Sequence, residues 1–155
     1  MFTSDFTNQM SIDTITDFTV LNSTGAPGDI IEFYEYDLGF NAQGFYPFYH
    51  ASSNAPQEST SKQIIGVLDQ TLTDWSNAAQ VMENTLSDFG DGSNDDTYFV
   101  VNNGTNGRIY YWSGDIDGQN DIDKGELTHM ADLQNITVTD IQDMSEYNFG
   151  IIEGP

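Results

Sequence analysis

A run of acidic and amide side chains, Asp115-Ile-Asp-Gly-Gln-Asn-Asp-Ile-Asp-Lys-Gly-Glu126, has the length and spacing of a twelve-residue calcium-binding loop. Such a loop supplies oxygen ligands from alternate positions, and its last residue is a glutamate that binds the ion with both carboxylate oxygens. The ligand positions are filled by residues that all carry suitable oxygen atoms: Asp115, Asp117, Gln119, Asp121 through its carbonyl, Asp123 and Glu126. Because hard oxygen ligands favour a hard divalent cation, the pattern predicts a Ca²⁺ site.

The loop departs from the usual EF-hand pattern at its fifth and sixth positions. The sixth position normally holds Gly because its backbone needs a positive φ, and here it holds Asn120, which also tolerates the left-handed region. The fifth ligand, Gln119, is a neutral amide in place of a carboxylate. Ile122 has the apolar character of the residue that such loops turn toward the core. The alternative interpretation is an exposed acidic turn, which arises readily in a chain rich in Asp.

The overall charge is strongly negative, with 25 Asp and Glu against three Lys and Arg and a formal net charge of −22. Nucleic acid and anionic membranes are excluded as partners because both would repel the chain, and no apolar run is long enough for membrane insertion. Self-repulsion also destabilises a compact state, so calcium or high ionic strength should stabilise the fold. A halophilic origin is a competing explanation of the same charge.

Length and composition predict one domain over residues 1–155, since 37% hydrophobic and 13% aromatic residues can fill a core. The absence of cysteine excludes disulfides and thiolate metal sites. The first residues, Met1-Phe-Thr-Ser-Asp5, lack the basic and apolar regions of a signal peptide, so a Sec-exported precursor is not expected.

Catalysis is not favoured by the residue types that are present. The two histidines, His50 and His129, do not belong to a zinc signature such as His-Glu-x-x-His, and the chain has no nucleophile elbow or phosphate-binding glycine loop. Paired carboxylates and aromatic platforms could serve glycoside hydrolysis, but 25 acidic residues place such pairs together by chance. Trp75 and Trp112 are predicted to lie in the core, although an exposed Trp112 would favour sugar binding. We therefore predict that the protein is not an enzyme.

Residues 1–58 are predicted to be rich in β-structure. Two runs of β-branched and aromatic residues, 14–20 and 29–36, flank a turn rich in Gly and Pro and predict a hairpin with a wide loop. Between Gly39 and Ser61, turn-forming residues are mixed with five aromatics and predict irregular structure with packed rings, namely Phe40, Phe45, Tyr46, Phe48 and Tyr49.

Residues 59–90 are predicted to form one long amphipathic helix. Apolar residues from Ile64 to Phe89 recur at intervals of three and four, Ser59 or Ser61 can cap the start, and Gly90 can end the helix. Its apolar stripe predicts that the helix packs on a sheet.

Residues 91–155 are predicted to contain a β-hairpin, the calcium loop and C-terminal strands. Runs 97–102 and 108–112 flank Asn103-Gly104, a turn signal typical of hairpins, and the loop follows the second run directly. The segment after Glu126 suits either a helix or a return strand, of which we favour the strand. The alternating segment 136–152 should end in a strand at a sheet edge. The fold class expected is α+β, an antiparallel sheet packed against one long amphipathic helix, with an EF-hand-like calcium loop.

Two stretches resemble modules of RTX-type calcium-binding proteins, which bacteria export by type I secretion. One is Asp13-Thr-Ile-Thr-Asp-Phe18 followed by Gly28-Asp-Ile-Ile-Glu-Phe33, and it resembles the segment after the glycine-rich repeats of that family. The other runs from Asp96-Thr-Tyr-Phe-Val-Val-Asn-Asn-Gly-Thr105 through the acidic loop to Glu126-Leu-Thr-His-Met-Ala-Asp-Leu-Gln-Asn-Ile-Thr137, and it resembles their C-terminal modules. The glycine-rich nonapeptide repeats are absent, so the resemblance implies a flanking module.

The resemblance implies a non-catalytic, calcium-stabilised module of a secreted or cell-surface protein, with Ca²⁺ as its ligand and the type I secretion apparatus as a partner. The end of the chain, Gly150-Ile-Ile-Glu-Gly-Pro155, departs from the acidic and apolar ending of the family's export signal, which places a signal role in doubt. The alternative function is an extracellular adhesion or carbohydrate-binding module in which the same calcium orients a glycan or surface partner. A carboxylate-based glycoside hydrolase is the less favoured alternative.

Overall fold

The computed structural model describes residues 12–20, 28–34, 48–58, 63–69, 72–89 and 97–152. Strands dominate these ranges: β1 Asp13–Ile15, β2 Ile31–Tyr34, β3 Phe48–Ala51, β4 Gln57–Glu58, β5 Gln63–Val67, β6 Leu86–Asp88, β7 Thr97–Asn102, β8 Gly107–Trp112, β9 Leu127–Leu133 and β10 Phe149–Ile152. The helices are short: α1 Ala78–Glu83, α2 Val138–Asp143, and the 3-10 turns η2 Trp75–Asn77, η3 Lys124–Glu126 and η4 Glu146–Asn148. Within the described ranges no helix has the length and apolarity of a membrane span.

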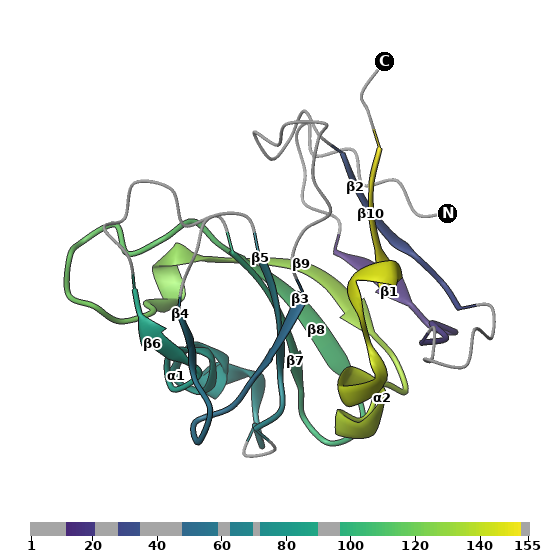
Figure 1. Cartoon of the computed structure of the whole chain (residues 1–155), viewed down its shortest axis with the longest axis horizontal. Coiled ribbons are helices and arrows are strands. Elements are labelled where there is room, and N and C mark those ends of the chain that lie inside the picture. The colour runs from purple at the N-terminus through teal and green to yellow at the C-terminus, as the bar shows by residue number, and fades with distance from the viewer. Residues whose placement is uncertain are drawn as a thin grey trace.

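The main sheet has six strands in the order β1-β9-β8-β7-β5-β3 and is mixed (Figure 1). Strands β9, β8 and β7 pair antiparallel, whereas β1 with β9, β7 with β5 and β5 with β3 pair parallel. Two smaller parallel pairs, β10 with β2 and β4 with β6, lie outside this sheet. The predicted antiparallel sheet is therefore wrong, because three of the five strand pairings in the main sheet are parallel.

The predicted long helix over 59–90 is also wrong, because residues 63–67 form β5 and residues 75–83 form only η2 and α1. Ile64 packs in one core cluster and Ile65 in the other, so neighbouring side chains point to opposite faces as in a strand. All five β5 residues are buried, because apolar clusters cover both faces of the sheet at β5, which also has a parallel neighbour on each side. A strand that is buried on both faces has a nearly continuous apolar run. Here the spacing of those apolar residues also fitted a helix.

The predicted hairpin of runs 14–20 and 29–36 is not formed by the described residues. Strand β1 pairs with β9 and β2 pairs with β10, both far along the chain. The two runs are joined by hydrogen bonds near their ends, where Asp29 N donates to Thr19 O at 2.8 Å and Thr19 N donates to a carboxylate oxygen of Asp29 at 2.8 Å. In the aromatic segment 39–61, residues 48–51 form β3 and residues 57–58 form β4 where irregular structure was predicted, while Phe40, Phe45 and Tyr46 lie outside the described residues.

The predicted central hairpin is confirmed, with β7 paired to β8 from Thr97 opposite Trp112 to Asn102 opposite Gly107. Gly104 in the turn has φ +100°, a conformation that glycine adopts without strain. The predicted return strand after Glu126 is confirmed as β9. The segment 136–152, expected to alternate as a strand, instead begins with α2, which Thr137 caps by accepting a hydrogen bond from Asp140 N. Only β10 at its end is a strand.

The two faces of the main sheet bury separate apolar clusters. One contains Ile64, Tyr98, Val100 and Ile109 and lies toward α2 and β10, whose Ile141 and Phe149 join it. The other contains Ile65, Phe99, Val101 and Trp112 and lies toward η2 and α1. Strands β7 and β8 contribute to both clusters, so the loop that leaves β8 starts from a strand that is buried in the core.

Candidate metal centre

The acidic loop connects β8 to β9, two central strands that pair with each other along their length. It leaves the sheet after Trp112 and returns through η3 just before Leu127. Because both ends are fixed to paired strands, its first and last carboxylates are brought back toward one another. Asn120 has φ 58°, so the left-handed turn predicted at this position is confirmed. Ile122 is 4% exposed and packs in the cluster with Trp112, as predicted for an apolar anchor.

Three of the predicted ligands converge. Carboxylate oxygens of Asp115, Asp117 and Glu126 all lie within 4.8 Å of one another and could hold a metal ion. Asp115 is buried, Glu126 is half-buried and Asp117 is exposed. The three carboxylates therefore form a site that solvent can reach from the side of Asp117. Three carboxylates without nitrogen or sulfur donors favour a hard cation.

Backbone N–H groups of the loop hold Asp115 in place. One of its carboxylate oxygens accepts from Gly118 N at 2.8 Å and the other from Asn120 N at 2.9 Å. These bonds fold the first half of the loop around a buried carboxylate, and they preorganise that carboxylate in the geometry that the turn requires.

Glu126 closes the loop from the other end. Its Oε1 accepts from Ile116 N at 2.8 Å, and its Oε2 accepts from Asp123 N at 3.2 Å. Oε2 also accepts a hydrogen bond of 3.0 Å from the indole Nε1 of Trp112. The sequence did not predict this last contact. The position of a Trp directly before the loop was the available signal, but alternation along a strand does not say which face meets the glutamate.

The other predicted ligands are placed differently. The Gln119 amide nitrogen donates to a carboxylate oxygen of Asp117, and Gln119 itself is exposed. Asp123 is exposed and precedes η3, where its N–H is one of the donors to Glu126. Asp121 is half-buried, and its Oδ1 is shielded from solvent without a hydrogen-bond partner. A shielded carboxylate oxygen without a donor is costly unless a cation or a proton compensates for it.

Electrostatic repulsion in the loop is visible at the Asp121 side chain. Its pKa is raised above the usual value for aspartate, first by burial and then by the charges of Asp123, Asp117, Asp115 and Glu126. The folded loop therefore binds a proton at Asp121 more tightly than an unfolded chain would. A divalent cation among these carboxylates would supply the same compensation at neutral pH.

Comparison of the chain with protein-family models, with curated proteins and with solved structures gave no match. The chemical character of the loop therefore rests on its own donor atoms. The resemblance to RTX-type modules stays a prediction.

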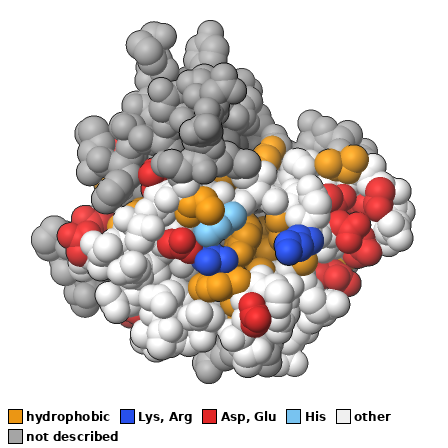
Figure 2. Space-filling model, turned by 180° about the vertical axis from the view of Figure 1, so that it is seen from behind, with side chains coloured by type: hydrophobic (Ala, Val, Ile, Leu, Met, Phe, Trp, Pro, Cys, Tyr) orange, Lys and Arg blue, Asp and Glu red, His pale blue; other side chains and the backbone are white. Residues whose placement is uncertain are grey.

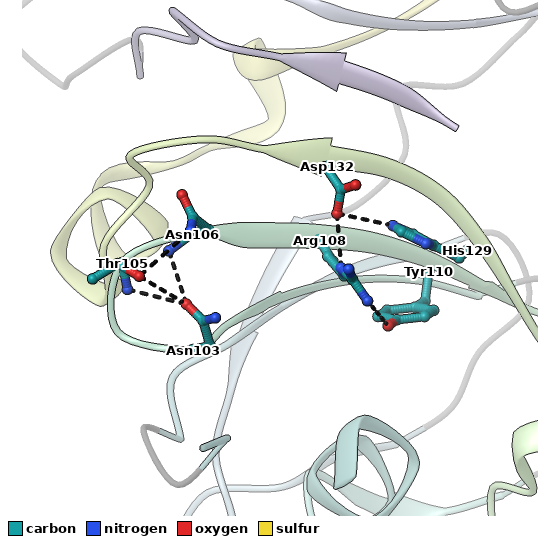
Figure 3. A network of polar contacts seen from close by, with 7 residues as sticks. All are labelled: Asn103, Thr105, Asn106, Arg108, Tyr110, His129 and Asp132. Carbon is teal, nitrogen blue, oxygen red and sulfur yellow. Dashed lines mark hydrogen bonds and ion pairs between the residues drawn. The ribbon is translucent and has the colours of Figure 1, made fainter. Parts of the chain in front are cut away.

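A second polar cluster lies across β8 and β9 (Figure 3). Arg108 Nε donates to Asp132 Oδ1 at 2.7 Å, and the Arg108 guanidinium lies 4.2 Å from the ring centre of Trp75. His129 Nε2 lies 3.2 Å from the same oxygen without the angle of a hydrogen bond, and its pKa is lowered by burial and by the charge of Arg108. The cluster joins two strands and η2, which is a structural role.

One face of the molecule has basic, histidine and apolar side chains near its middle, while acidic side chains gather toward its edge (Figure 2). Among the described residues, no group of three metal-ligating side chains includes His50 or His129. Trp112 is fully buried, as predicted for a core residue, so the exposure that would have favoured sugar binding is absent there. Tyr49, from the aromatic segment, is 37% exposed.

Proposed function

We propose that the chain is a non-catalytic calcium-binding module of a secreted bacterial protein, and that Ca²⁺ stabilises its fold outside the cell. The observation that carries this proposal is the convergence of Asp115, Asp117 and Glu126 between two central strands. An oxygen-only ligand set that ends in a glutamate is the chemistry Ca²⁺ prefers, since this ion accepts six to eight oxygen ligands in flexible geometry.

The proposed mechanism couples ion binding to folding. Where calcium is scarce, repulsion among the carboxylates keeps the connection from β8 to β9 loose, and the chain stays competent for export. Outside the cell, calcium neutralises the loop and holds the two strands together. The raised pKa of Asp121 supports this mechanism, because burial and the neighbouring carboxylates both oppose a negative charge at that side chain. The resemblance to RTX-type modules supports type I secretion as the export route.

The expected gain in stability is moderate. A site with a Kd of about 10⁻⁴ M, typical of extracellular calcium modules, adds about 1.4 kcal/mol to the free energy of unfolding at roughly 1 mM calcium. For a chain of this length, that corresponds to a rise in Tm of about 3 to 6 °C.

Thermal melts in calcium and in sodium chloride test the proposal. The chelator-treated protein should melt about 3 to 6 °C higher in roughly 1 mM CaCl₂ than in NaCl of the same ionic strength. The comparison matters because a net charge of −22 would make any salt stabilising through screening. Equal Tm values in the two salts would indicate general screening, as expected of a halophilic protein, and would contradict a specific site.

A further inference from the structure

We infer that Trp112 is the residue that sets the ion specificity of the metal centre, because its indole N–H holds the Glu126 carboxylate in one orientation and thereby favours Ca²⁺ over Mg²⁺. The inference rests on the proposed function and adds to it the discrimination between two divalent cations. It assigns Trp112 a positioning role, since the indole reaches the ion only through Glu126.

The donor that Trp112 supplies is fixed by the core. The Trp112 side chain is fully buried, and its ring packs against Phe89 and Phe99 with centroid separations of 6.2 and 6.4 Å. Its Nε1 donates to Glu126 Oε2 at 3.0 Å. A buried indole surrounded by rings cannot follow a carboxylate that turns away, so rotation of Glu126 would leave the N–H without a partner. The cost of such a buried orphan donor opposes the rotation.

The other two donors to Glu126 do not provide the same constraint. Ile116 N, which donates to Oε1, and Asp123 N, which donates to Oε2, both belong to the loop itself. They move with the loop when it adapts to an ion. Trp112 is thus the donor that ties the carboxylate to the sheet, and together the three donors occupy both carboxylate oxygens.

Orientation of the glutamate separates the two ions. Ca²⁺ accepts a carboxylate through both oxygens at about 2.3 to 2.6 Å, whereas Mg²⁺ requires near-octahedral geometry at about 2.0 to 2.1 Å. Adapting such a site to Mg²⁺ requires the carboxylate to turn and present a single oxygen. A carboxylate held on both oxygens resists this turn, so loss of the indole donor should weaken Ca²⁺ binding and remove part of the discrimination against Mg²⁺.

Titration calorimetry with CaCl₂ and, separately, MgCl₂ tests the inference on wild type and Trp112→Phe. Phenylalanine keeps an aromatic ring but has no N–H donor. The Ca²⁺ Kd should rise by about 10-fold, the usual effect of losing an outer-shell partner, while the Mg²⁺ Kd changes much less. The ratio of the Mg²⁺ Kd to the Ca²⁺ Kd should therefore fall. An unchanged ratio in Trp112→Phe would overturn the inference.

A matched control separates this role from general core damage. Phe89→Leu removes a ring that contacts Trp112 but leaves the indole donor in place. It should lower the Tm and leave the ratio of the two Kd values unchanged. If Phe89→Leu lowers the ratio as much as Trp112→Phe does, core packing is responsible and the inference fails.

An NMR measurement on wild type keeps the test decisive if Trp112→Phe does not fold. The indole N–H resonance of Trp112 should shift on addition of CaCl₂ and shift less with MgCl₂, with the Trp75 resonance as the internal comparison. The same response to both ions would overturn the inference. Absence of any Ca²⁺ binding by wild type would instead remove the proposed function, and this inference with it.

Discussion

Replacing Asp115 and Glu126 together by alanine should weaken calcium binding by more than about 100-fold, since loss of outer-shell partners alone costs about 10- to 100-fold. These residues contribute two of the three converging carboxylates and also fold the loop through hydrogen bonds from Gly118, Asn120 and Ile116. Titration calorimetry on the chelator-treated variant measures the affinity directly. The calcium-dependent rise in Tm should disappear with it.

A second double variant controls for the loss of two negative charges. Asp143→Ala with Glu146→Ala also removes one Asp and one Glu, both exposed, from α2 and η4. Its calcium affinity should match that of wild type. If both double variants lose calcium binding equally, the ion responds to the overall charge of −22 and not to the loop. Melts of the loop variant without calcium separate the structural cost of losing the Glu126 acceptor, about 1 to 3 kcal/mol, from the loss of the ion.

Gly66→Ala should destabilise the protein by about 2 to 3 kcal/mol, within the range for overpacking a core. A Cβ at Gly66 in β5 would lie 2.8 Å from the ring of Phe48 and 2.9 Å from Cγ2 of Ile141. Ile141 is fully buried, and Phe48 stacks on Phe149 with ring centres 5.3 Å apart, so neither can easily move. Denaturant unfolding measures the change.

The sign of that change distinguishes the strand from the predicted helix. In a helix over 59–90, Gly66→Ala would raise stability by about 1 kcal/mol, since alanine is the better helix former. Gly125→Ala is the matched control, because a Cβ there meets no atom within 4 Å. A stabilising Gly66→Ala, or equal effects of the two substitutions, would contradict the assignment of 63–67 to β5.

Features encoded by neighbouring residues could be predicted from the sequence. The hairpin of β7 and β8 followed from the turn signal Asn103-Gly104 between two β-branched runs, although the loop spans the four residues 103–106, since Asn102 lies opposite Gly107. The acidic loop followed from ligand spacing within twelve residues, and the left-handed Asn120 from the tolerance of that side chain for positive φ. In each instance the residues that decide the structure lie next to one another in the chain.

Features that depend on distant partners could not be predicted in this way. Parallel pairing of β1 with β9 and of β2 with β10 joins segments more than a hundred residues apart, and no local pattern specifies it. In residues 63–67, the apolar run suited both a helix and a strand. Hydrogen-bonded pairing with parallel neighbours on both sides favours the strand. The indole contact to Glu126 also depends on how the sheet and the loop are joined.

The most direct test of the calcium site is a crystal structure of the protein grown with ample CaCl₂. We expect one ion at the start of the β8–β9 connection, with oxygens of Asp115, Asp117 and Glu126 at about 2.3 to 2.6 Å from it. Glu126 should bind through both oxygens while Trp112 Nε1 still donates to Oε2. Carboxylates of the loop that point into solvent around no ion, at a calcium concentration far above physiological, would contradict the proposed function.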